Sequence, residues 1–267
     1  MPDSKRRRSG APSAARVWPQ LPTELAEHII SFLEPNEVPG FRLVNQAAAA
    51  QFRGPSYTTI RLSQPVPLQL FAAHWLAPGS TRGLTRKRRR QLLSLTAASG
   101  VVANLEVALR AAGCTLTPEV FLAAAAAGRL DMCRWLLQRG CPTTKDGASG
   151  SQILAEAARG GHQHVCEWLM GLNLTWMWGG FCEAAQSGSV ELLAWLRCRG
   201  CEWGSEAFTA AVESGCEEAV EWLLTKGCPV EAGGAPYLAA CRNGDLATVR
   251  LLRRLGVPWD AVGAPAV

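Results

Sequence analysis

The clearest pattern in this sequence is a pair of short apolar runs, each ended by a glycine, that recurs along the chain. In Ala207–Val230 an alanine-rich run stops at Gly215. A second run then places Val220 and Leu223 on one face and closes at Gly227. This spacing predicts two antiparallel helices, the second with the broader apolar face.

The same plan recurs in three further stretches, which are Val120–Pro142, Phe181–Cys201 and Tyr237–Pro258. A Trp-Leu pair recurs near the end of each second helix. The spacings are 33, 27, 27 and 29 residues along the series Trp135, Trp168, Trp195, Trp222 and Leu251, the last of which stands in the place of the tryptophan. The closing glycines repeat with them: Gly113, Gly140, Gly200, Gly227 and Gly256.

Recurring hairpins of this length predict a stack. A hairpin of two short helices has an apolar face on both sides, and isolated helices of about ten residues are marginal in water. Alanines in the first helix allow close approach, while Trp and Leu in the second fill the space between layers. We therefore expect an all-α solenoid of about five to six hairpins over residues 85–267.

The hairpins resemble ankyrin repeats. Ala-Ala before a glycine turn, followed by V-x-x-L-L-x-x-G, is typical of that family, and Val190–Leu196, Val220–Leu224 and Val249–Leu252 carry the second part. The chain departs from the family in lacking the Thr-Pro-Leu-His opening and in a period near 27 instead of the usual 33. The resemblance implies degenerate repeats with short Gly-Cys-Pro-Trp loops and a non-enzymatic role in binding protein partners.

A second informative stretch is Val17–Phe52. Thr23 can cap a helix whose apolar residues form one stripe, and Glu34-Pro35 stops that helix. The stripe consists of Leu25, Ile29, Phe32 and Leu33. A second helical run is expected over Phe41–Phe52.

This stretch resembles an F-box motif. The apolar positions that match the motif are Leu21, Pro22, Leu25, Ile29, Leu33 and Val44. The resemblance implies that this surface docks on the Skp-type adaptor of a cullin–RING ubiquitin ligase, which would make the chain a substrate-recognition subunit. Pro39-Gly40 and Ala47–Ala50 depart from the motif. The alternative is a plain repeat scaffold in which these helices only cap the open end of the solenoid.

The rest of the N-terminal third divides into a tail and a connector. Residues 1–16 are basic and rich in small residues, so we expect a disordered tail; Lys5–Arg8 fits either a nuclear-import signal or a solubilising tail. Residues 17–53 form the F-box-like segment and 54–84 the connector. In the connector we expect a short strand at Tyr57–Leu62 and a helix at Leu68–Leu76, packed on the cap.

Charge is distributed unevenly. Residues 1–90 hold 14 Lys/Arg and 5 Asp/Glu, whereas residues 91–267 hold 13 and 17. The slightly acidic array argues against nucleic acid as a partner. One helix start nevertheless has five consecutive cations, Arg86, Lys87, Arg88, Arg89 and Arg90. This basic patch fits either a solvated face or a site for nucleic acid or phosphoinositide.

The sequence contains no pattern that predicts catalysis, a metal site or a cofactor. Several of the ten cysteines recur at repeat positions, which indicates reduced packing residues of an intracellular protein, cytoplasmic or nuclear. Cys198-x-x-Cys201 lacks a second ligand pair for zinc. No apolar run is long enough to span a membrane.

One loop position recurs three residues after the closing residue of each hairpin, which is Asn173 in the unit that contains Trp168 and a glycine in the others. The candidates for partner binding at this position are Thr143, Trp176, Trp203 and Trp259. Exposed tryptophans there would anchor a partner. Leu116 and Val230 at the same position favour the alternative, in which the loop residues seal adjacent repeats.

Overall fold

The computed structural model describes residues 22–44, 46–143, 151–172, 174 and 180–259. Leu21, Trp176 and the tail at residues 1–16 therefore lie outside the described residues. The regular elements among the described residues are all helices, and none is a strand.

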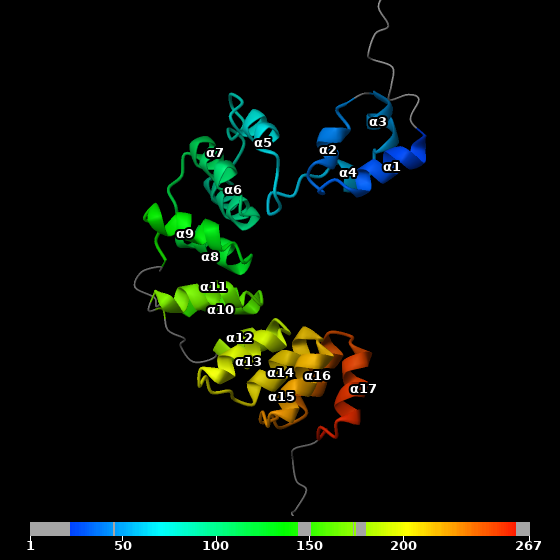
Figure 1. Ribbon diagram of the computed structural model, residues 1–267, viewed down its shortest axis with the longest axis vertical. Coiled ribbons are helices and arrows are strands. Elements are labelled where there is room, and N and C mark those ends of the chain that lie inside the picture. The colour runs from blue at the N-terminus through cyan, green and yellow to red at the C-terminus, as the bar shows by residue number, and fades with distance from the viewer. Residues whose placement is uncertain (1–21, 45, 144–150, 173, 175–179, 260–267) are drawn as a thin grey trace, which may run out of the picture.

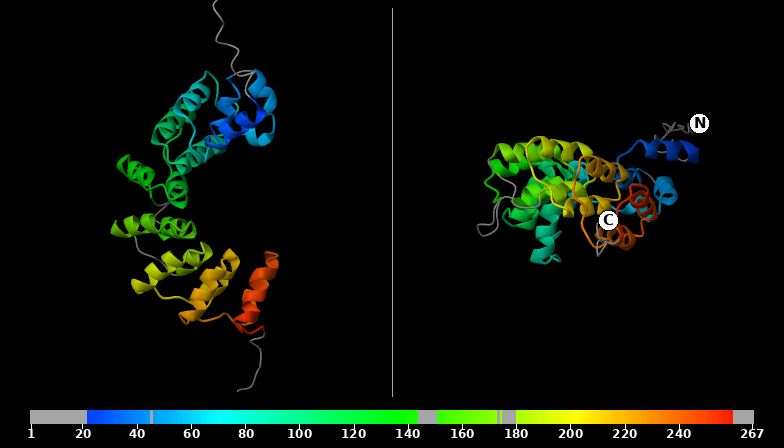
Figure 2. Two further views of the ribbon diagram at one scale, coloured as in Figure 1. Left: turned by 45° about the vertical axis from the view of Figure 1, so that its right-hand side comes forward. Right: turned by 90° about the horizontal axis from the view of Figure 1, so that it is seen from below.

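The main body is a curved array of helical hairpins (Figures 1 and 2). Each hairpin turns at a glycine with positive φ, such as Gly128 at 70° and Gly215 at 73°. The hairpins among the described residues are α6 (Arg86–Ser99) with α7 (Val102–Ala112), α8 (Pro118–Ala126) with α9 (Leu130–Gln138), α10 (Ser151–Arg159) with α11 (Gln163–Gly171), α12 (Gly180–Gln186) with α13 (Val190–Cys198), α14 (Glu206–Ser214) with α15 (Glu217–Thr225), and α16 (Ala235–Arg242) with α17 (Leu246–Arg254).

The first helices of the hairpins stack on one another and form the inner side of the crescent (Figure 1). From α8 onward, each first helix has an alanine four residues before its turn glycine. This alanine has no exposed surface because the neighbouring helix lies against it. These alanines are Ala124, Ala157, Ala184, Ala211 and Ala240. Because an alanine side chain ends at Cβ, two helices can approach closely at these positions. The first helices are therefore closely spaced on the inner side.

The second helices bury a leucine at one recurring position, eight residues after the turn glycine. These leucines are Leu136, Leu169, Leu196, Leu223 and Leu252. The tryptophans one residue earlier are only half-buried. The guanidinium groups of Arg139 and Arg199 lie over the rings of Trp135 and Trp195, 4.8 and 4.5 Å from their centroids. The leucines, more than the tryptophans, thus fill the space between layers.

The N-terminal helices form a small unit with its own core. They are α1 (Thr23–Ser31), α2 (Val38–Phe41), α3 (Gln46–Gln51) and α4 (Pro55–Thr58). Ala26, Val38, Ala48 and Phe52 are buried there, and none of them belongs to the core of the array.

The open end of the array is covered by α5 (Leu68–Trp75), which packs on α7. Phe71 of α5 and the preceding Val66 are buried in the core of the array. The prediction of a helix at Leu68–Leu76 is therefore correct, but its main contact is with the first hairpin. A capping role belongs to α5, because the apolar stripe of α1 does not enter the core of the array.

Two local predictions in this region are wrong. The helix expected over Phe41–Phe52 is broken into α2 and α3, because α2 already begins at Val38 with Pro39 in its first turn, where a missing N–H costs nothing. The strand expected at Tyr57–Leu62 is absent, and Pro55 instead starts the short helix α4. A strand needs a neighbouring strand, whereas Arg61 bonds to the side chain of Asn36.

Candidate functional site

The inner side of the crescent presents one recurring surface position, two residues before each turn glycine. Ala98 and Ala126 occupy it in α6 and α8. From α10 onward the position is polar and exposed, with Arg159, Gln186, Glu213 and Arg242 in successive first helices. The inner face therefore changes from apolar to polar and charged along the array.

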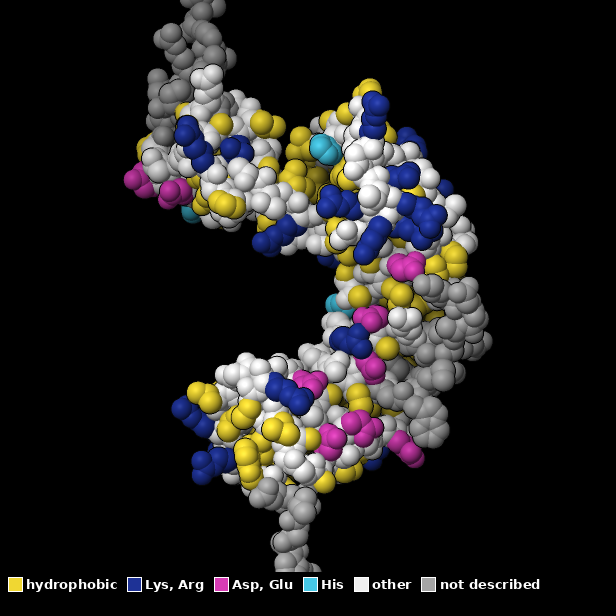
Figure 3. Space-filling model, turned by 180° about the vertical axis from the view of Figure 1, so that it is seen from behind, with side chains coloured by type: hydrophobic (Ala, Val, Ile, Leu, Met, Phe, Trp, Pro, Cys, Tyr) yellow, Lys and Arg dark blue, Asp and Glu magenta, His cyan; other side chains and the backbone are white. Residues whose placement is uncertain are grey.

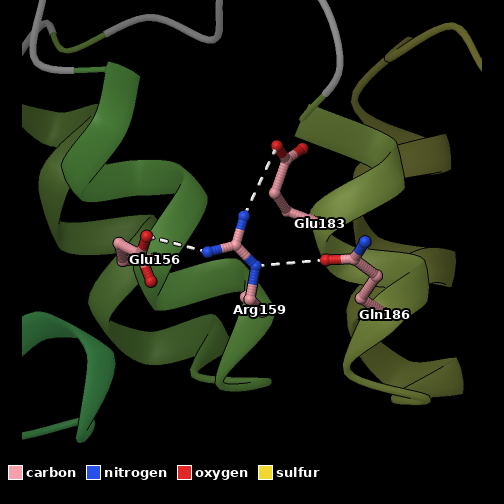
Figure 4. Close-up of polar contacts among 4 residues, drawn as sticks. All are labelled: Glu156, Arg159, Glu183 and Gln186. Carbon is pink, nitrogen blue, oxygen red and sulfur yellow. Dashed lines mark hydrogen bonds and ion pairs between the residues drawn. The ribbon is translucent and has the colours of Figure 1, made fainter. Parts of the chain in front are cut away.

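Arg159 joins two hairpins across this face (Figure 4). Its Nη1 donates to Oε1 of Glu156 in the same helix at 2.8 Å, and its Nε donates to Oε1 of Gln186 in α12 at 3.1 Å. Oε1 of Glu183, also in α12, lies 3.9 Å from Nη2. These contacts hold the guanidinium group at the start of the polar row.

A groove of about 380 Å³ follows this row from α10 to α16. Its lining includes Arg159, Gln186, Glu213 and Arg242, together with the neighbouring Asn243. The side chain of Asn243 donates to the carbonyl of Glu213 at 3.1 Å, which ties α16 to α14. No ion pair involves the side chains of Glu213 or Arg242 within the described part of the chain. The groove thus offers one free carboxylate and one free guanidinium group to a bound molecule.

This row was not predicted, although the sequence contains a signal for it. The alanine pairs define the buried side of each first helix, and a residue two positions before the glycine lies on the opposite side. Reading that position across the repeats gives Arg159, Gln186, Glu213 and Arg242.

The predicted adaptor-binding residues lie on the N-terminal unit, far along the chain from the groove. Leu25, Ile29 and Val44 are 49%, 38% and 63% exposed, and Phe32 beside them is 76% exposed. Pro22 is exposed at the start of α1, Leu33 is half-buried, and Leu21 lies outside the described residues. The side of α1 that contains Ala26 faces the small core, so the apolar stripe faces solvent.

The predicted loop residues are not brought together as one surface. Trp203 is half-buried between the rings of Phe181 and Trp222, with centroid distances of 5.2 and 6.1 Å. Trp259 is 59% exposed and packs on Tyr237. Thr143 is half-buried, and Trp176 lies outside the described residues.

The basic patch occupies the first turns of α6. Arg86, Lys87, Arg88 and Arg90 are exposed, whereas Arg89 is half-buried and donates from Nη1 to the carbonyl of Ala112 at 2.8 Å. Figure 3 shows Lys and Arg side chains gathered on one arm of the crescent and Asp and Glu side chains mainly along the other.

The buried thiols are poorly suited to nucleophilic chemistry. Burial raises the pKa of Cys133 and of Cys166 to about 12, and that of Cys141 and Cys228 to about 11. A nucleophilic cysteine needs the thiolate, which a raised pKa suppresses. No cluster of His, Cys, Asp or Glu in the described residues could hold a metal ion.

The two neighbouring histidines have structural contacts. Nε2 of His162 lies 3.0 Å from the carbonyl oxygen of Ala126, and Nε2 of His164 lies 3.0 Å from that of Gly128. Both imidazoles thus connect the third hairpin to the second. Within the described ranges, the structure has no helix of the length and hydrophobicity that crossing a bilayer requires.

Comparison with known families identifies part of the array. Residues 181–260 match the family model of ankyrin repeats, with 3 copies. This region contains α12 to α17 and most of the polar row. A search of curated proteins found no match. Ankyrin repeats serve as protein–protein interaction modules, and every residue that lines the groove except Arg159 lies in the matched region.

Proposed function

We propose, from the ankyrin repeats in residues 181–260, that this protein is a non-enzymatic interaction protein that holds a segment of a partner protein in the groove across α10–α16. The observation that carries the proposal is the row of Arg159, Gln186, Glu213 and Arg242 on the inner face. A stacked array fixes the backbone of each hairpin while its surface residues vary freely, which suits recognition.

The groove predicts the character of the bound segment. Glu213 and Arg242 lie on adjacent hairpins with opposite charges, so the segment is polar and places a basic group near Glu213 and an acidic group near Arg242. Arg159, which is held by its hydrogen bonds to Glu156 and Gln186, occupies the other end of the row. Such a charge pattern selects a partner and its orientation more than it adds affinity.

The test compares two variants of the full chain in affinity capture read by quantitative mass spectrometry. The groove variant is Gln186→Ala with Glu213→Ala and Arg242→Ala. The control is Glu191→Ala with Glu217→Ala and Arg250→Ala, three exposed residues of the second helices. A partner that uses the groove is lost with the first variant and kept with the second. Equal capture by wild type and groove variant would show that the groove is not the binding surface.

A second candidate function is the substrate-recognition subunit of a cullin–RING ubiquitin ligase. The specific observation in its favour is the exposure of Leu25, Ile29 and Val44, which the F-box resemblance assigns to contact with a Skp-type adaptor. Phe32 beside them is also exposed and extends the same apolar surface. A solvent-facing apolar stripe on a small helical unit is typical of a docking surface. In this arrangement α1 holds the adaptor and the array holds the substrate.

The adaptor hypothesis is tested by co-expression with a recombinant Skp-type protein. Leu25→Ser with Phe32→Ser removes exposed apolar surface without opening the small core. We expect co-purification of the adaptor to be lost and the melting temperature to change by less than about 2 °C. Leu238→Ser with Leu246→Ser, two exposed leucines of the last hairpin, is the matched control. If the wild-type chain does not retain the adaptor, the ligase role is wrong and the plain scaffold remains.

A further inference from the structure

The basic patch of α6 lies in a long stretch of the chain whose charged side chains are all positive. Residues 38–105 contain nine Lys/Arg and no Asp or Glu. We propose that Arg86, Lys87, Arg88 and Arg90, here called the basic tip, bind a short acidic segment of a partner protein. This site is separate from the groove and does not depend on it.

Among the described residues, the four side chains of the basic tip have no ion-pair partner. Thr85 caps α6 by accepting from the N–H of Arg88, and Arg89 donates to the last carbonyl of α7. The other four side chains are exposed and make no ion pair with any described residue. Cations in the first turn of a helix oppose its dipole and repel one another, so they do not stabilise α6.

The size of the basic tip favours a short ligand. Five consecutive helical residues extend over about 6–8 Å along the helix axis. Three of the four side chains are arginines, whose planar groups bind carboxylates in a bidentate manner. A few clustered Asp or Glu side chains match this dimension, whereas a nucleic-acid duplex requires cations spread over a much longer path.

The surroundings of the tip argue against two other polyanions. Residues 76–117 contain no aromatic residue, so neither α6 nor α7 supplies a ring on which the bases of a single-stranded nucleic acid could stack. The first turns of α8 and α14, which follow in the stack of first helices, contain Glu119 and Glu206. An anionic bilayer that followed these helix starts would meet those carboxylates and be repelled by them.

The experiment measures binding of a fluorescein-labelled dodecaglutamate peptide to the full chain by fluorescence anisotropy near 0.15 M salt. The tip variant is Arg86→Gln, Lys87→Gln, Arg88→Gln and Arg90→Gln, and it keeps Arg89 for its bond to Ala112. The control variant has the same change of net charge elsewhere: Arg134→Gln, Lys226→Gln, Arg250→Gln and Arg253→Gln. A dodecathymidine oligonucleotide and vesicles of phosphatidylcholine with one-fifth phosphatidylserine serve as the other probes.

We expect the tip variant to weaken peptide binding at least tenfold and the control variant to weaken it less than twofold. The melting temperature of the tip variant stays unchanged or rises, because repulsion at the start of α6 is relieved. Equal weakening in both variants, or no peptide binding by the wild type, overturns the proposal. Tighter, tip-dependent binding of the oligonucleotide or the vesicles also overturns it. The groove variant should bind the peptide as the wild type does, so failure of one proposal leaves the other intact.

Discussion

Asn36 of the N-terminal unit and Asn104 of the array hydrogen-bond to consecutive residues of the same connector. Nδ2 of Asn36 donates to the carbonyls of Arg61, Gln64 and Pro65 at 2.7, 3.2 and 3.0 Å, and Nδ2 of Asn104 donates to that of Val66 at 2.8 Å. Both asparagines are 1% exposed. The N-terminal unit and the array are thus joined through two buried amides that replace the missing strand partner of this segment.

The first prediction concerns this junction. Asn36→Asp replaces a donor that faces three carbonyls with a buried carboxylate, and leaving such groups unpaired costs about 2–4 kcal/mol. We expect the amide of Arg61, which donates to Oδ1 of Asn36, to exchange with solvent much faster. Hydrogen exchange followed by mass spectrometry measures this, and limited proteolysis should cut the connector. The exposed Asn243→Asp is the control, and unchanged exchange at residues 59–66 would contradict the prediction.

A second prediction separates two costs of replacing a glycine at the end of a helix. Gly113 and Gly128 both have positive φ, so alanine at either position costs about 1–2 kcal/mol. A Cβ at Gly113 meets no atom within 4 Å, whereas one at Gly128 lies 2.6 Å from Nδ1 of His162. We therefore expect Gly128→Ala to lower the free energy of unfolding by about 1–3 kcal/mol more than Gly113→Ala. Urea denaturation of both variants tests this; equal losses would mean that the ring moves aside freely.

A third prediction is a pH dependence that involves His162. Burial lowers the pKa of this imidazole, with further lowering by His164 and Arg129, against a raising effect of the bond to Ala126. Below about pH 6.5 the unfolded chain takes up a proton at His162 while the folded chain resists it. The free energy of unfolding should therefore fall between pH 7.5 and 5.0, and the fall should be smaller in His162→Gln. Urea titrations at both pH values measure it, with His74→Gln as the matched control.

A fourth prediction uses the thiols as reporters of the core. Cys133 and Cys166 have no exposed surface and a pKa of about 12, whereas Cys198 and Cys241 are exposed. Iodoacetamide at pH 7.5 should modify the two exposed residues within minutes and leave the two buried ones unmodified, as peptide mass spectrometry can show. In denaturant all ten cysteines should react. Rapid modification of Cys133 in the native chain would mean that the second hairpin opens readily.

The array could be predicted from the sequence because each hairpin repeats the same local physics. Gly128 or Gly215 ends a helix by adopting a positive φ, and the alanines before it can only serve as close-packing positions. The pattern did not show which large residue of the second helix is innermost. Trp222 and Leu223 are both large apolar residues, but only the leucine is fully buried.

The N-terminal third was harder to predict because non-local contacts decide its conformation. Tyr57–Leu62 alternates like a strand, yet its backbone partner is Asn36, more than twenty residues earlier in the chain. The groove was missed for a different reason: Arg159 and Arg242 are ordinary surface arginines until stacking places α10, α12, α14 and α16 in one row.

The buried alanines of the inner layer also determine how far apart the two ends of the crescent lie. Because buried alanines lie between the first helices while buried leucines lie between the second helices, each hairpin is wedge-shaped, and the wedges add up to a bend. Each alanine therefore helps to set the angle between two successive hairpins, and the sum of these angles determines the distance between the ends of the crescent. Enlarging one of them, as in Ala184→Val, would push two first helices apart, flatten the bend there and widen the distance between α1 and α17. The spacing between two partners held at the ends therefore depends on the size of side chains that neither partner touches.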